Sequence, residues 1–125
     1  MAQIPDPEPP AVPAGGLRNT PLLDPDGARL GDVVDVAVYA PTGAVAYALV
    51  ACGGVLGVGR KHRPVPFDLM RFDTDRNGFV TPLRREDLIL APEIEAGDLR
   101  DWTDAGLRPR LYDHYGPLGA RPFWL

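Results

Sequence analysis

One stretch of the chain, residues 45–67, constrains the fold more than any other. It reads VAYALVACGGVLGVGRKHRPVPF: an apolar run, a glycine-rich bend, a short basic segment and Pro-Val-Pro-Phe. Four of its glycines, Gly53, Gly54, Gly57 and Gly59, fall within seven residues. Such a run bends the backbone sharply, because only glycine adopts positive φ without steric cost. A strand that folds back so tightly is typical of a small, strongly curved sheet, so the chain is expected to form a small β-barrel.

Length and charge narrow the class of protein further. The 125 residues allow one domain with tails, and the formal net charge of −4 argues against a general electrostatic grip on nucleic acid. No apolar run reaches the roughly 18 residues of a membrane helix, and the N-terminus lacks the pattern of a secretory signal. The single cysteine, Cys52, excludes an intrachain disulfide and fits a reducing compartment. We therefore expect a cytoplasmic protein without a transmembrane segment of its own.

The inventory of catalytic side chains is nearly empty. The chain contains no serine, which excludes a Ser-His-Asp hydrolase. Cys52 lies in an apolar strand pattern, where a thiol behaves as a small inert hydrophobe. His62 lies among cations and His114 has no second imidazole near it in the sequence, so neither has the spacing of a metal ligand. The sequence predicts a protein that is not an enzyme, with no catalytic residue, metal or cofactor.

Alternating apolar residues predict a hairpin in the first half of the chain. In residues 30–39 the side chains of Val34, Val36 and Val38 share one face, which is the period of a half-buried strand. Residues 45–52 return after a Pro-Thr-Gly turn, with small residues on one side that suit the inside of a narrow barrel.

Further elements complete an antiparallel, all-β domain with no βαβ alternation. Pro64 and Pro66 cannot both serve a central strand, so the segment around them should be an extended edge. Asn77-Gly78 is a strong hairpin signal. The expected elements are strands at 20–23, 30–39, 45–52, 60–66, 70–73 and 79–82, with short helical stretches at 67–69 and 83–90.

The two ends differ from the expected barrel, which spans residues 17–92. Residues 1–16 carry five prolines and should form an extended or disordered arm, either free or draped over a partner. Residues 93–125 are acidic and then aromatic, with one short helix that has Pro109 in its first turn and stops at Gly116. The aromatic residues of this tail either cover the core or form an exposed protein-binding patch; they are Trp102, Tyr112, Tyr115, Phe123 and Trp124.

Three short motifs resemble ligand-binding patterns. Residues 73–78 imitate the first half of an EF-hand calcium loop, but Arg84 stands where the loop needs a bidentate glutamate, so a plain turn is favoured. Residues 54–61 resemble a phosphate-binding loop but lack its lysine, its hydroxyl residue and its helix. A basic segment is either simply solvated or a docking surface for an acidic partner or anionic head groups; it comprises Arg60, Lys61, His62 and Arg63.

The order of these elements resembles the PRC-barrel domain over about residues 17–92. The resemblance rests on VAYALV followed by GG-x-LG-x-G and PVPF, and on a tail, W…YDHYG…RPFW, similar to the ends of stand-alone bacterial members. It implies a β-barrel like the cytoplasmic part of the photosynthetic reaction-centre H subunit; a related barrel occurs in a ribosome maturation factor. In the family these barrels are not enzymes but assembly modules that dock on other proteins. The H subunit caps the membrane reaction centre near its quinone side, and this chain departs from it by lacking its membrane helix.

The leading hypothesis is a non-catalytic barrel that binds other proteins, as a soluble H-subunit-like accessory on the cytoplasmic side of a photosynthetic membrane complex. The expected partner-binding residues are the basic segment and the aromatic residues of the tail. Three alternatives stay open: a stand-alone barrel that self-associates, a ligand- or ion-sensing barrel that uses residues 73–77, and an RNA or ribosome assembly factor that uses the basic segment.

Overall fold

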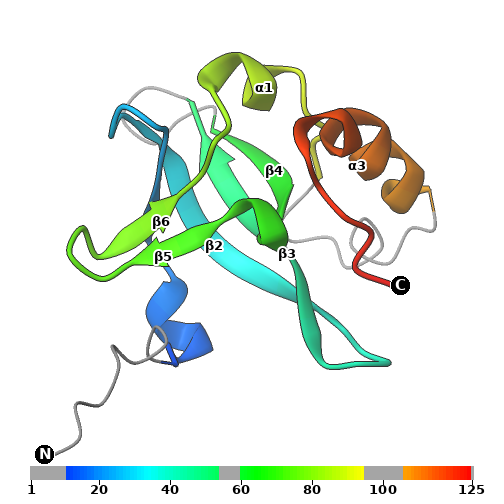
Figure 1. Ribbon diagram of the computed structural model, residues 1–125, viewed down its shortest axis with the longest axis horizontal. Helices are drawn as coiled ribbons and strands as arrows, with labels where there is room; N and C mark the ends of the chain where they lie inside the picture. Colours follow the sequence, from blue (N-terminus) through cyan, green and yellow to red (C-terminus); the bar gives the residue numbers. More distant parts are fainter. Residues whose placement is uncertain (1–10, 54–59, 95–105, 125) are drawn as a thin grey trace, which may run out of the picture.

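The computed structural model describes residues 11–53, 60–94 and 106–124, and most of its regular structure is one six-stranded sheet (Figure 1). The strands are β1 (Thr20–Leu23), β2 (Arg29–Tyr39), β3 (Ala44–Cys52), β4 (Lys61–Pro66), β5 (Arg71–Asp73) and β6 (Gly78–Val80). The helices are α1 (Arg85–Ile89) and α3 (Leu107–Tyr115), and single turns of 3-10 helix are η1 (Ala14–Leu17), η2 (Phe67–Leu69) and η3 (Gly116–Leu118). The predicted strands and short helices are confirmed to within about two residues at each end.

The sheet is mostly antiparallel and it is open. Its order is β4-β3-β2-β1-β6-β5, and β1 pairs with β6 in parallel, while the other four pairs are antiparallel. Strand β4 lies at one edge, as its prolines predict, and β5 lies at the other. Because these two edges do not pair, the predicted closed barrel is not confirmed. They are nevertheless joined by residues 67–70 alone, which keeps the two edges close at that end.

Two register shifts interrupt the expected alternation of β2. Against β3 they lie between Val33 and Asp35 and between Ala37 and Val38. Such bulges break the period of two and increase the local twist of the strands. Val38 is 57% exposed near the tip of the hairpin, which projects beyond the rest of the sheet (Figure 1). The prediction of a half-buried valine face is therefore wrong for Val38.

Strand β3 is buried on both faces. Every residue from Ala46 to Cys52 is at most 9% exposed. The C-terminal helix contributes to the same core: Leu107, Leu111 and Tyr115, which recur every four residues along α3, are buried in the cluster that contains β3. Helix α3 lies beside β4 in Figure 1. The C-terminal tail thus contributes side chains to the same hydrophobic core as the strands.

The sequence predicts a backbone bend at the glycines that begin with Gly53 and a helix end at Gly116, and the two glycines differ in conformation. Gly53 has a φ of +74°, the left-handed backbone that the predicted bend requires, whereas the other three glycines of the bend lie outside the described residues. Helix α3 ends at Tyr115, but Gly116 keeps a right-handed helical φ and starts η3, and the left-handed residue is Gly119. The α-helix therefore ends at the predicted residue, and one turn of 3-10 helix follows before the left-handed Gly119.

The N-terminal arm is described only from residue 11. Val12 packs against the core and η1 begins at Ala14, so the last part of the predicted arm is folded. No helix among the described residues has the length and apolar character needed to cross a membrane.

Candidate functional site

The basic segment lies at the start of β4, and its first residue is bound within the fold. The Arg60 guanidinium donates to Asp32 Oδ2 at 2.8 Å and to the Ala51 carbonyl at 2.7 Å. Arg29 Nε donates to the other oxygen of Asp32, also at 2.8 Å. Burial alone would raise the pKa of Asp32, but hydrogen bonds from the two arginines outweigh it and lower this pKa. Arg60 thus fastens the start of β4 to β2.

Stability at low pH should depend on Asp32. Because its pKa is lower in the folded chain, the carboxylate contributes stability above the unfolded pKa of about 4, and this contribution is lost as the pH falls through the folded pKa. We expect Asp32→Asn to be less stable than the wild type at neutral pH, with a difference that shrinks below about pH 4. Urea unfolding across this range measures the difference. Asp75→Asn, at an exposed turn position, is the control, and a difference for Asp32→Asn that is independent of pH would contradict the assignment.

Arg63 is buried, with 7% of its surface exposed. One of its nitrogens donates to the Ala91 carbonyl, and the other lies 3.3 Å from Glu93 Oε1. Glu93 also forms an ion pair with Lys61, whose Nζ lies 3.6 Å from its second oxygen, Oε2. The chain from Ala91 to Glu93 is therefore held against β4 by the same cations that the sequence presents as a surface patch.

The backbone of the basic segment takes part in this contact as well. The Ile94 N–H donates to the His62 carbonyl at 3.0 Å, next to the Glu93 ion pairs. Three members of the segment, Arg60, Lys61 and Arg63, thus have acidic partners inside the chain. The interpretation of the segment as a simply solvated run is wrong for Arg63, and its capacity to attract an anionic partner is smaller than the sequence suggests.

A small pocket of about 180 Å³ lies beside the basic segment. Its apolar lining consists of Leu30, Cys52, Leu88 and Ile89, and its cations are Lys61, Arg63 and Arg85. Burial raises the pKa of the Cys52 thiol, which is 9% exposed, so this group stays protonated and unreactive, in agreement with its predicted structural role. The pocket is suited to hold an apolar group that has a negative charge next to it.

Two large apolar side chains are exposed at the end of α1. Ile89 is 60% exposed and Leu90 is 77% exposed, whereas Leu88 is buried. A helix of five residues can turn only one side toward the core, so three consecutive apolar residues cannot all be buried. Ile89, Leu90 and Arg85 were not among the predicted site residues. The signal for the first two is the run Leu88-Ile89-Leu90 at the end of a very short helix.

The aromatic residues of the tail gather around Arg108. Its guanidinium carbon lies 5.3 Å from the ring centre of Tyr39, 5.6 Å from that of Phe123 and 5.3 Å from that of Trp124. Tyr112 accepts the N–H of Phe123 through its hydroxyl at 3.2 Å and packs edge to face on Trp124. All four rings are half-buried, so they dock the tail on the end of β2 and leave part of their surface in solvent.

The other two predicted aromatic residues do not join this group. Tyr115 is completely buried, burial raises its pKa, and its hydroxyl has no hydrogen-bond partner among the described residues. It belongs to the core, which corrects its assignment as a partner-binding residue. Trp102 lies outside the described residues.

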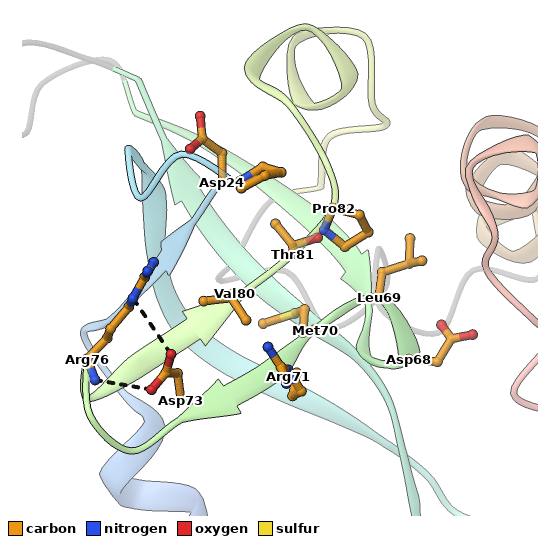
Figure 2. Close-up of a pocket in the computed structure, with 11 residues that line it drawn as sticks. Asp24, Asp68, Leu69, Met70, Arg71, Asp73, Arg76, Val80, Thr81 and Pro82 are labelled. Carbon is orange, nitrogen blue, oxygen red and sulfur yellow. Dashed lines mark hydrogen bonds and ion pairs between the residues drawn. The ribbon is translucent and has the colours of Figure 1, made fainter.

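A wider depression of about 480 Å³ lies where the turn after β1, η2 and the β5–β6 hairpin meet (Figure 2). The Asp73 carboxylate there accepts the backbone N–H groups of Asp75 and Arg76 and pairs with the Arg76 side chain at 3.7 Å. Asn77 takes the left-handed conformation of a tight turn, and Arg84 pairs with Asp26. Within the described residues no three metal-ligating side chains come together. The geometry is that of the favoured turn.

His114 also has a structural contact. Its Nε2 lies 2.6 Å from the Asp87 carbonyl, which ties α3 to α1. His62, on β4, contributes its carbonyl to the contact with Ile94. Within the described residues, the ring of His114 therefore connects two helices, and neither imidazole is hydrogen-bonded to a carboxylate in the way a general base requires.

Comparison with protein-family models decides the family. The model of the PRC-barrel domain matches residues 14–88, which is more than half of the chain. The chain belongs to the PRC-barrel family. The matched region runs from η1 into α1 and contains all six strands, as the resemblance implied, whereas α3 lies beyond it. Membership points to a non-catalytic module. A search among curated proteins finds no match.

Proposed function

We propose that this PRC-barrel chain is a non-catalytic docking module that binds another protein through the surface beside α1. The observation that carries the proposal is the exposure of Ile89 and Leu90, two adjacent large apolar side chains, of which Ile89 lines a pocket. Apolar surface that is gathered around a concave site is characteristic of interaction surfaces, whereas single exposed apolar residues are common everywhere. The family supports the absence of chemistry at this site.

In its specific form, the proposal makes the chain a soluble, H-subunit-like accessory of a photosynthetic reaction-centre complex, bound at its cytoplasmic face. The support for this form is the resemblance of residues 45–67 to the H-subunit barrel. The ion-sensing and RNA-binding alternatives receive less support. The Asp73 carboxylate is bound within its own turn, and the arginines Arg60 and Arg63 are bound to protein groups.

Recovery of a partner from the native host tests the docking function. We expect the tagged full-length chain, crosslinked in cells, to retain one protein at constant stoichiometry, and an Ile89→Ser, Leu90→Ser variant to lose most of it. Val38→Ser, which alters another exposed apolar residue, on the hairpin of β2 and β3, should retain the partner. A wild-type chain that remains monomeric and alone at cellular concentration would overturn the function.

Gradient centrifugation of solubilised membranes separates the general proposal from its specific form. Comigration of the chain with a pigment-containing complex supports the reaction-centre form. Recovery of a stable partner in fractions without pigment would refute that form and leave the docking function in place.

A further inference from the structure

The pocket beside α1 has an apolar interior, and the charged side chains that line it within the described residues are all cations. Leu30, Cys52 and Leu88 are its buried apolar residues, and among the described residues that line it there is no carboxylate. It belongs to a chain with a net charge of −4, so a cationic rim here runs against the charge of the whole molecule. Such a local reversal of charge favours a negatively charged occupant.

The three cations of the rim are not equally available. Arg63 is buried and bound to Ala91 and Glu93, and Lys61 shares Glu93 at 3.6 Å. Arg85 is exposed and forms no ion pair with any residue in 11–53, 60–94 or 106–124. Arg85 is therefore the cation whose charge is left for an incoming carboxylate, with Lys61 as its neighbour on the rim.

The apolar surface continues outside the pocket. Ile89 lines it and is still 60% exposed, and Leu90 next to it is 77% exposed. A small amphiphilic acid would fill the pocket and leave this outer surface uncovered. A polypeptide covers both, because one side chain enters the pocket while its neighbours lie on Ile89 and Leu90.

We propose that the pocket and the Ile89–Leu90 surface bind an acidic segment of a partner protein. An apolar side chain of that segment enters between Leu30 and Leu88, and a carboxylate beside it pairs with Arg85. This inference rests on the proposed docking function and adds the chemistry of the partner. The charge complementarity of the rim decides for an acidic segment over a neutral or basic one.

Selection of phage-displayed random peptides on the full-length chain tests the inference. We expect the selected peptides to be enriched in Asp and Glu next to a large apolar residue. The affinity of a selected peptide should fall by about tenfold or more in Arg85→Glu, and it should weaken with added salt because Arg85 is exposed. Arg85→Glu should fold, since an acidic residue in the first turn of a helix is favourable.

Matched controls locate the binding site. Arg71→Glu makes the same change of charge on β5, at the opposite edge of the sheet, and should bind the peptide as the wild type does. Leu90→Ser should weaken binding and Val38→Ser should not.

Several results would overturn the inference. The first two are selected peptides that are not enriched in acidic residues and a peptide affinity that is the same for Arg85→Glu as for the wild type. The third is displacement of the peptide by decanoate together with unchanged peptide affinity in Leu90→Ser, which would indicate a small amphiphilic acid as the occupant. The fourth is self-association of the chain that Leu90→Ser abolishes while no peptide binds, which would indicate a second copy as the occupant. If crosslinking recovers a partner that Arg85→Glu retains, the inference fails while the docking function stands. If no partner is recovered at all, the docking function itself fails.

Discussion

Gly31→Ala should destabilise the fold by about 2–3 kcal/mol, although it adds only one methyl group. A Cβ atom at Gly31 would lie 2.5 Å from the carbonyl oxygen of Ala51 and 2.9 Å from Val50 Cγ1. Real Cβ atoms do not approach a backbone oxygen so closely, and this oxygen belongs to the neighbouring strand β3. Relief of the clash must therefore push β2 and β3 apart at a point where both are buried.

Urea unfolding followed by circular dichroism measures this loss against a matched glycine. At Gly116 an added Cβ meets no atom within 4 Å, and the φ of −55° suits alanine. Gly116→Ala should thus leave stability unchanged or raise it by up to about 1 kcal/mol, through the lower entropy of the unfolded chain. Equal stability of the two variants would show that β2 and β3 do not approach each other this closely.

The sequence predicts the parts of the fold that depend on neighbouring residues, and it does not predict contacts between distant segments such as this close approach. Turns and hairpins depend on a few adjacent residues, so Asn77-Gly78 and Pro64 with Pro66 predict a hairpin and an edge strand that the structure confirms. The parallel pairing of β1 with β6 joins residues more than fifty positions apart, and no local pattern encodes it. The bulges in β2 likewise arise from its fit to β3.

The candidate site shows the same limit. The basic segment is visible in the sequence, but its neutralisation depends on Glu93, about thirty residues later, and on Asp32, about thirty residues earlier. The exposure of Ile89 and Leu90 depends on how much of α1 the core can cover, which is a property of the assembled fold. The buried face of α3 is a contrast, because Leu107, Leu111 and Tyr115 recur every four residues and this spacing is visible in the sequence.

Tyr115→Ala should destabilise the whole domain, although Tyr115 lies on the C-terminal helix α3 and the match to the family model ends at residue 88. The Tyr115 side chain is fully buried among the core residues, so Tyr115→Ala removes a large aromatic group and leaves a cavity. We expect a loss of about 3–5 kcal/mol in the free energy of unfolding. That is a large share of the stability of a domain of this size, so the variant should be partly unfolded at 37 °C.

A second variant, Tyr115→Phe, distinguishes the packing of the Tyr115 ring from the hydrogen bonding of its hydroxyl. The hydroxyl has no hydrogen-bond partner within the described residues, and a buried hydroxyl without a partner costs stability. Tyr115→Phe keeps the ring and removes this cost, so it should be as stable as the wild type or more stable by up to about 1 kcal/mol. Thermal and urea unfolding of the two variants compares them directly. A loss in Tyr115→Phe as large as that in Tyr115→Ala would mean that the hydroxyl has a strong partner, and a small loss in Tyr115→Ala would mean that α3 contributes little to the core.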